Sequence, residues 1–185
     1  MIDLLAITDA DAPPAAPVRL IRAGGLGALC APASSEPADS DALWRHEELV
    51  EELMAERALL PVRFGTRVSG EDEIAALLAE RRDEFAAALE HVRGAVELAV
   101  RVQPSGAPGS LDAEHDVHGP LRALARDTSI QPGDDLFRAA YLVDRGGVGV
   151  FVRAVRRLQE RNPGLAVLCT GPWPPYSFAS GPRPS

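Results

Sequence analysis

A long amphipathic segment, followed at once by an alternating one, constrains the fold of this 185-residue chain more than any other feature. Large apolar residues recur at helical spacing through 69–93, which predicts one long helix with a capping box at 69–72 and a stop at Gly94. Apolar and more polar residues then alternate over 96–102, the pattern of a strand with one solvated face. The helical stripe has to be buried against a sheet or another helix. The stripe consists of Ile74, Leu77, Leu78, Phe85, Leu89 and Val92.

The N-terminal part predicts a strand and a hairpin that lead into another helix. The apolar run 2–7 ends before a pair of prolines and is expected to form the first strand. The runs 18–22 and 26–31 flank Gly24-Gly25, two residues that can take the positive φ angles of a tight turn. Asp39 or Ser40 is expected to cap the next helix. One side of that helix faces inward and the other is acidic, with Leu43, Val50, Leu53, Met54 and Arg57 on the first and Glu47, Glu48, Glu51 and Glu52 around the second.

Pro61 marks the end of that helical pattern. It lies in the run 59–66 (LLPVRFGT), lacks an amide hydrogen and disfavours helix at the residue before it. The run is therefore expected to be extended and to lie at a sheet edge, where a missing amide donor is tolerated.

Two domains are predicted, with their boundary in a linker. The segment 103–110 carries two prolines and two glycines in eight residues, so we place a linker at 103–114. The first domain then spans 1–103 and the second 104–185.

The second domain begins with weak patterns and ends with strong ones. Over 112–126 the sequence allows a short helix that Gly119-Pro120 would break, and 128–135 is typical of a loop. The strand-like runs 137–143 and 165–170 then flank an amphipathic helix. Two strands joined in this way are expected to be parallel, in a right-handed crossover.

The tail 171–185 opens with a proline-rich, aromatic run, GPWPPYSF at 171–178. The run holds three of the nine aromatic residues of the chain, Trp173, Tyr176 and Phe178. Its three prolines fix φ and remove amide donors, so a stiff, extended strip is expected there. Rings of this kind each bury about 150–250 Å². They therefore either cover the protein's own core or form part of a docking surface for a partner.

Charge and composition narrow the classes of partner. Nineteen basic and twenty-seven acidic residues give a net charge of −8, so nucleic acid and anionic membranes are poor partners. No apolar run approaches the roughly 18 residues of a membrane span, and the N-terminus has no basic leader. Cys30 and Cys169 lie in apolar stretches, as buried free thiols do in a reducing compartment. A soluble, cytoplasmic protein is expected.

No motif predicts a catalytic, metal or cofactor site. The triplet at 46–48 opens like a zinc-protease motif, but Val50 stands where the second histidine would be. His115 and His118 have a spacing that could suit a metal, yet a site needs a third or fourth ligand. The glycines at 24–27 precede a strand-like run and not a helix, so they do not predict a dinucleotide loop. We therefore expect a protein that is not an enzyme and has no metal or cofactor.

Three runs, in their order and spacing, resemble the GvpF/GvpL family of gas vesicle proteins: 59–66, 140–144 (AYLVD) and 171–178. His46, in the helix before the first run, and the strand at 96–98 also resemble this family. The resemblance implies two small α+β domains of modified ferredoxin-like type that end in the Pro/aromatic tail. The region 104–135 is shorter than is usual in the family, so the second domain is expected to be shortened.

The same resemblance implies a minor structural or accessory role in gas vesicle formation, in the cytoplasm and at the gas vesicle. The vesicle wall needs an apolar inner face, so its small shell subunit is prone to aggregate before assembly and needs a soluble escort. The expected partners are therefore the shell protein GvpA and other gas vesicle accessory proteins. The candidate contact residues are Arg63, Phe64, Trp173, Tyr176 and Phe178.

Two other classes of function stay open at this point. A ferredoxin-like regulatory module would bind a small ligand at a sheet or dimer interface, and ligands would then raise its thermal stability. An α+β enzyme would bring scattered residues together in the fold. A deep pocket lined by a charged pair would favour the enzyme, and a flat or filled surface would disfavour it.

Overall fold

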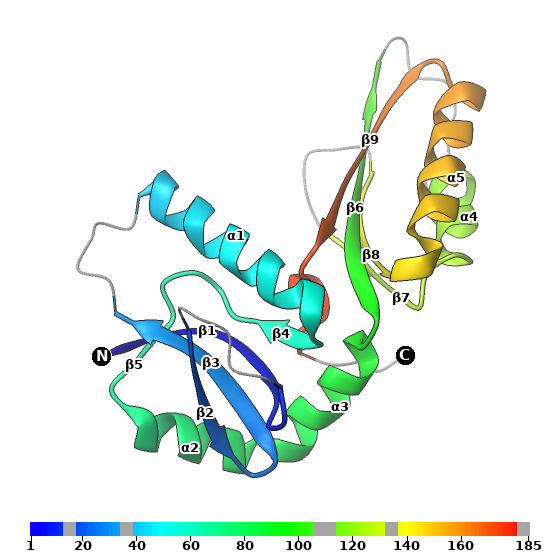
Figure 1. Ribbon diagram of the computed structural model, residues 1–185. Coiled ribbons are helices and arrows are strands. Elements are labelled where there is room, and N and C mark those ends of the chain that lie inside the picture. The colour runs from blue at the N-terminus through cyan, green and yellow to red at the C-terminus, as the bar shows by residue number, and fades with distance from the viewer. Residues whose placement is uncertain (13–17, 34–38, 106–113, 132–136, 181–185) are drawn as a thin grey trace. The chain divides into compact units, whose positions relative to one another are not determined.

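The computed structural model of the chain describes residues 1–12, 18–33, 39–105, 114–131 and 137–180 (Figure 1). The chain divides into two compact units, one made of Met1–Arg93 with the segment that begins at Pro174, the other of Gly94–Trp173. The predicted boundary at 103/104 lies inside the strand β6 (Ala95–Pro104), whereas the units divide between Arg93 and Gly94. All of β6 belongs to the second unit, because it pairs with β8 and β9 of that unit. The tail predicted for the second domain is shared between the two units. Most of the predicted linker, 106–113, lies outside the described residues.

The first unit contains an antiparallel sheet whose strands do not follow one another in chain order. Its strands run in the order β2-β3-β1-β4, and β5 also pairs with β1. The predicted hairpin is confirmed, since Gly24 and Gly25 turn the chain with φ angles of 60° and 83°. The strand that contains Pro61 lies at the sheet edge, as predicted. The strands are β1 (Ile2–Asp9), β2 (Arg19–Ala23), β3 (Leu26–Pro32), β4 (Leu59–Pro61) and β5 (Arg67–Val68).

Helices cover both faces of this sheet. In Figure 1 the helix α1 (Ser40–Glu56) lies on one side, and α2 (Glu71–Glu80) and α3 (Arg82–Val92) lie on the other. This arrangement explains why β1 is buried continuously from Leu4 to Thr8, with no alternation between a wet and a dry face. The core of the first unit is therefore a helix–sheet–helix sandwich centred on β1.

The single helix predicted over 69–93 is wrong, because the chain bends at Arg81, where φ is −109° and ψ is 22°. Contacts explain the bend: α2 packs on β2 and β3, whereas α3 packs on β4 and β1. The apolar stripe is therefore divided between two short helices, and each helix covers a different part of the sheet. At the bend, Arg82 Nε donates to the carbonyl oxygen of Gly24 at 2.9 Å, which ties the helix pair to the hairpin turn.

The predicted capping box is displaced by one residue. Glu73, not Asp72, accepts hydrogen bonds from the Ser69 amide at 2.7 Å and from the Ser69 hydroxyl. Helix α2 begins after Gly70, which has no capping side chain of its own. Only the half of the box in which the carboxylate reaches back to the preceding residue is formed, because no described side chain accepts from the first amides of the helix.

The second unit has the element order of a ferredoxin-like domain. Its strands are β6, β7 (Asp127–Ile130), β8 (Phe137–Asp144) and β9 (Leu165–Trp173), in the order β7-β8-β6-β9. A π turn (Glu114–His118) with the one-turn helix α4 (Gly119–Arg122) precedes β7, and α5 (Val148–Arg161) joins β8 to β9 after a short 3-10 turn (Arg145–Gly147). All four strands of a ferredoxin-like sheet are therefore present, and the first connecting helix is the short one.

Two expectations for this unit need adjustment. Strands β8 and β9 are both antiparallel to β6 and so are parallel to each other as predicted, but β6 lies between them. The loop predicted at 128–135 is wrong in its first part, because Asp127–Ile130 forms β7 by pairing with β8. Its polar sequence has no apolar alternation, so the strand depends on its neighbour. The remainder, 132–135, lies outside the described residues.

The core of the second unit lies between the sheet and α5. Phe151 and Val155 of α5 pack with Val100 of β6 and Tyr141 of β8. His118 is 6 % exposed, and its Nδ1 lies 3.1 Å from the Tyr141 hydroxyl. Burial raises the pKa of Tyr141 well above its ordinary value, so the phenol stays neutral. On the other face of β6, Glu97 is only 7 % exposed, so the predicted solvated strand face is wrong at this position.

The stiff, extended strip predicted for the tail is wrong beyond Trp173. Strand β9 continues to Trp173, and the chain then curls into a 3-10 turn (Tyr176–Phe178). The turn forms because the Tyr176 amide donates to the Pro174 carbonyl at 2.8 Å and the Phe178 amide donates to the Pro175 carbonyl at 3.1 Å. The prolines supply acceptors there and do not hold the segment straight.

Gly171 is required where β9 approaches β6. Its φ is 113°, a region that favours glycine, and a Cβ at this position would lie 2.7 Å from the Glu97 carbonyl oxygen. Changing Gly171→Ala is expected to lower the free energy of unfolding by about 1–3 kcal/mol. The matched change Gly164→Ala, at a position with no neighbouring atom within 4 Å, is expected to shift it by less than about 1 kcal/mol. Urea unfolding followed by circular dichroism measures both, and equal stabilities of the two variants would contradict this assignment.

Candidate functional site

Helix α1 positions the first part of the candidate site. Asp39 caps it as predicted, accepting from the Ala42 amide at 2.9 Å. The inner side is formed by His46, Val50, Leu53 and Met54. Leu43, predicted to belong to this side, is 42 % exposed, so the buried stripe starts at His46. A histidine on the inner side of a helix needs a polar partner, and it finds one in the run 59–66.

His46 joins α1 to the loop that follows β4. Its Nε2 lies 3.3 Å from the Val62 carbonyl oxygen, and because a carbonyl only accepts, Nε2 carries the proton. The imidazole also packs edge-on against Phe64, with ring centroids 5.4 Å apart and an interplanar angle of 64°. Phe64 is therefore partly buried by this contact, while its neighbour Arg63 is exposed.

The terminal segment closes over the same place. The Tyr176 hydroxyl donates to Glu47 Oε1 at 3.1 Å and lies 3.5 Å from His46 Nε2. Burial, and then the charge of Glu47, raise the pKa of Tyr176 well above its ordinary value. We call His46, Glu47, Phe64 and Tyr176 the tail cluster, since they connect α1, the loop after β4 and the end of the described chain.

The structure separates the five predicted contact residues into different environments. Phe64 and Tyr176 both contact His46 in the tail cluster, and Arg63, which precedes Phe64 in the chain, is exposed. Phe178 is only 3 % exposed and belongs to the first unit. Trp173 belongs to the second unit, is 36 % exposed and donates from Nε1 to Thr170 Oγ1 at 3.2 Å. That these residues contact a partner stays a prediction.

Two members of the tail cluster were not predicted as site residues. In the sequence, His46 belongs to an incomplete zinc-protease motif and to the family resemblance, and Glu47 belongs to an acidic helix face. The interaction that brings in Tyr176 spans 130 positions along the chain. Only the position of His46 on the inner side of its helix could have indicated a polar contact there.

Metal-holding clusters and activated thiols are two kinds of reactive group that an enzyme can use. The described residues contain no group of three or more His, Cys, Asp or Glu side chains placed to hold a metal ion. Burial raises the pKa of the Cys30 thiol to about 11 and also raises that of Cys169, so both are protonated near neutral pH. Neither thiol is prepared to act as a nucleophile.

An open groove lies beside α5 in the second unit. It has a volume of about 470 Å³, and its apolar lining residues are Pro120, Ala154 and Leu158. The polar part of the lining consists of the exposed Arg157 and Arg161 together with Asp116 and Asn162. The groove does not have the buried charged pair that would indicate catalysis.

No helix within the described ranges is long and apolar enough to cross a membrane.

Comparison with known proteins identifies the family. The sequence profile of the family "Gas vesicle synthesis protein GvpL/GvpF" matches residues 6–110 and 110–180. This chain belongs to the GvpL/GvpF family. The resemblance found in the runs 59–66, 140–144 and 171–178 is thereby confirmed.

Curated relatives carry both names of this family. Gas vesicle protein F of a Streptomyces species (strain CB03234) is 27 % identical over 89 % of this chain and 89 % of its own length. Gas vesicle protein L of the same strain is 27 % identical over 76 % of this chain. Gas vesicle protein F2 of Halobacterium salinarum is 30 % identical over 67 % of this chain and 60 % of its own.

Solved structures confirm the fold of this GvpL/GvpF chain. The crystal structure of GvpF from Microcystis aeruginosa superposes with a TM-score of 0.80 at 17 % identity, over 96 % of this chain and 98 % of that one. GvpF from Anabaena gives a TM-score of 0.79 at 18 % identity. The predicted α+β class is confirmed, and the two ferredoxin-like domains of the prediction are compatible with it.

The tail cluster predicts a pH-dependent contribution to stability. Changing Tyr176→Phe removes the hydroxyl that bonds to Glu47 and is expected to lower the free energy of unfolding by about 1 kcal/mol at neutral pH. Because folding raises the pKa of Tyr176, its contribution is complete below the ordinary phenol pKa of about 10 and is lost as the pH rises above it. Urea unfolding at pH 7 and above pH 10 should therefore show a difference between wild type and variant that shrinks with pH.

The conservative change Glu47→Gln provides the control for this experiment. It keeps an oxygen that accepts from Tyr176 and should lower stability less than Tyr176→Phe does. A Tyr176→Phe protein as stable as the wild type at pH 7 would show that the tail cluster contributes nothing.

Proposed function

We propose that this protein is a non-catalytic accessory factor of gas vesicle formation, which binds the apolar shell protein GvpA or other gas vesicle accessory proteins during nucleation and assembly. Membership of the GvpL/GvpF family supports the gas vesicle role. The observation that carries the binding proposal is the apolar edge strand β9 in the second unit. The proposal places this activity in the cytoplasm and at the growing vesicle.

Strand β9 has the properties of a surface that accepts an apolar segment. Among the described residues it pairs with β6 alone, so the amide and carbonyl groups of its outer edge are available to a further strand. Two of the large apolar side chains that remain exposed lie on it, Leu168 at 53 % and Trp173 at 36 %. An exposed tryptophan at a sheet edge is a typical anchor of a protein interface, because it buries a large area with few rotatable bonds.

The chemistry of the proposed partner fits this edge. A shell subunit that will line a gas-filled space carries apolar surface that water cannot solvate well, so it gains free energy by covering that surface before assembly. Strand addition to β9 would satisfy backbone groups, and contacts with Leu168 and Trp173 would cover apolar side chains. The net charge of −8 on the whole chain would keep such a complex in solution.

The two tryptophans of the chain allow a matched test. Trp173→Ala is expected to lower retention of co-expressed GvpA on the tagged protein roughly tenfold or more, since an anchoring tryptophan contributes about 2 kcal/mol. Trp44→Ala, which removes the other exposed indole, should leave retention unchanged. In cells whose gas vesicle genes lack the GvpL/GvpF member, the wild type and Trp44→Ala should restore flotation, and Trp173→Ala should not. Full retention and flotation with a folded Trp173→Ala protein would overturn the proposal for this edge.

A further inference from the structure

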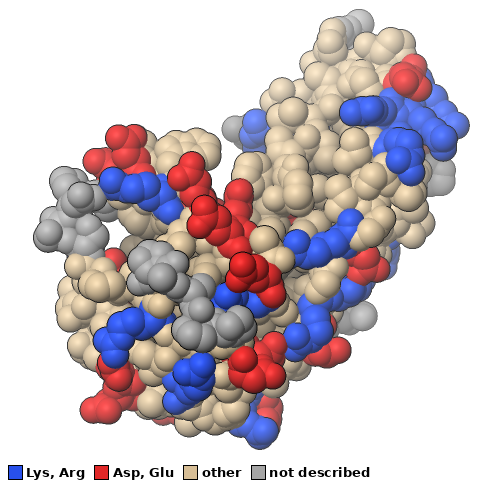
Figure 2. Space-filling model, viewed as in Figure 1, with Lys and Arg blue, Asp and Glu red and all other residues tan. Residues whose placement is uncertain are grey.

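The net charge of the chain resides entirely in one of the two units. The first unit contains eighteen acidic residues and ten arginines, whereas the second contains nine of each. Figure 2 shows acidic side chains following α1 and a group of basic side chains over α5. One unit is therefore strongly acidic, while the other is neutral overall but carries a local excess of positive charge.

Helix α5 carries four arginines and one acidic residue, Glu160, so its positive charge is only partly offset within the helix. Arg153, Arg156, Arg157 and Arg161 are all exposed, and we call them the arginine strip. No hydrogen bond or ion pair is found for any of these four side chains among the described residues. Other arginines do have acidic partners: Arg67 bonds to Asp3 at 3.0 Å, and Arg93 bonds to Asp9. Four unpaired guanidinium groups within three turns of helix repel one another, so a counter-charge would stabilise them.

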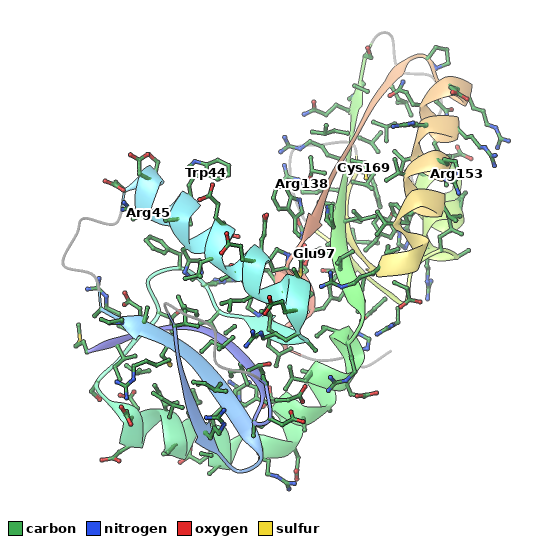
Figure 3. All side chains as sticks on the ribbon, viewed as in Figure 1. Trp44, Arg45, Glu97, Arg138, Arg153 and Cys169 are labelled. Carbon is green, nitrogen blue, oxygen red and sulfur yellow. The ribbon has the colours of Figure 1, made fainter. Side chains whose placement is uncertain are left out.

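The outer side of α1 carries the opposite charge. Trp44, Glu48, Glu51 and Glu52 follow one another at spacings of four, three and one residues, so they lie on one side of the helix, and we call them the glutamate strip. Trp44 is 64 % exposed and projects away from the sheet beneath α1 (Figure 3). No partner is found for the three carboxylates in the part of the chain that the structure describes. Partial burial and the charges of Glu47 and Glu48 raise the pKa of Glu51, as expected where negative charges accumulate.

The groove beside the arginine strip suits the aromatic residue of the glutamate strip. Three of its lining residues, Pro120, Ala154 and Leu158, are apolar, and two members of the arginine strip, Arg157 and Arg161, also line it. An apolar hollow edged by guanidinium groups favours an aromatic ring flanked by carboxylates, through burial, cation–π contact and ion pairing. Asp116, the one acidic residue in the lining, already has an interaction of its own.

We propose that a second copy of this chain docks the glutamate strip of its α1 on the arginine strip of α5, with Trp44 seated in the groove. Because the two surfaces are different patches of the same chain, the contact is head-to-tail and leaves one patch free at each end of a dimer. Such an association extends into rings or chains as the concentration rises. The proposal does not depend on the binding of GvpA, since it uses neither β9 nor the tail cluster.

Sedimentation velocity of the full chain at two ionic strengths gives the first test. In ~10 mM salt, where charges interact over about 30 Å, the protein should sediment as dimers and larger species; in ~1 M salt, where this range is about 3 Å, as a monomer. A monomer under both conditions, as an intramolecular contact between the strips would also give, overturns the proposal. Association that salt leaves unchanged overturns it as well.

A charge exchange gives the second and sharper test. Arg157→Glu/Arg161→Glu and, separately, Glu48→Arg/Glu52→Arg should each weaken self-association by roughly tenfold or more at low salt. An equimolar mixture of the two variants should associate again, because each then presents the charge that the other has lost. Arg63→Glu, which reverses an exposed arginine of the first unit, is the control and should associate as the wild type does. Circular dichroism checks that all variants are folded, and a mixture of folded variants that stays monomeric overturns the proposal.

Discussion

The closing of the first unit by the end of the chain is the constraint on which the rest of this structure depends. After Trp173 the chain leaves the second unit, and Pro174, Pro175 and Phe178 are buried in the first. The 3-10 turn packs on β4, and the Tyr176 hydroxyl is anchored on α1 by Glu47. A core assembled from both ends of a sequence cannot form until most of the chain is present, so the two units are linked in folding even though each has its own sheet.

The closing of the first unit also decides which aromatic side chains of the tail remain accessible to a partner. The sequence leaves two readings of the tail open, a cover for the protein's own core or a docking surface. The structure divides them by residue, since Phe178 belongs to the core whereas Trp173 stays partly exposed on the edge strand β9. Tyr176 lies between these cases, with its ring half-buried and its hydroxyl bonded. A single run of eight residues thus serves as strand end, turn and core contact.

Local chemistry could be predicted from the sequence, and tertiary choices could not. The positive φ of Gly24 and Gly25, the cap at Asp39 and the edge position of Pro61 follow from single residues and were expected correctly. The bend at Arg81 and the strand β7 were not expected, because the first depends on the width of a sheet and the second on pairing with β8. The same division holds for the site. The position of His46 on the inner side of α1 indicates a polar contact, but its partner Tyr176 comes from the far end of the chain. Likewise, the sequence does not show that the side chains of the arginine strip are exposed, which depends on how α5 packs.

Hydrogen exchange on a chain that ends at Trp173 tests the central claim most directly. If the terminal segment completes the first core, its loss should decrease amide protection in β4, on which the 3-10 turn packs, and in the part of α1 around His46 and Glu47, where Tyr176 is held. Protection in β6 and β8, whose bonds lie wholly within the second unit, should stay as in the full-length protein. Unchanged protection throughout the first unit, or a loss confined to the second, would contradict this account.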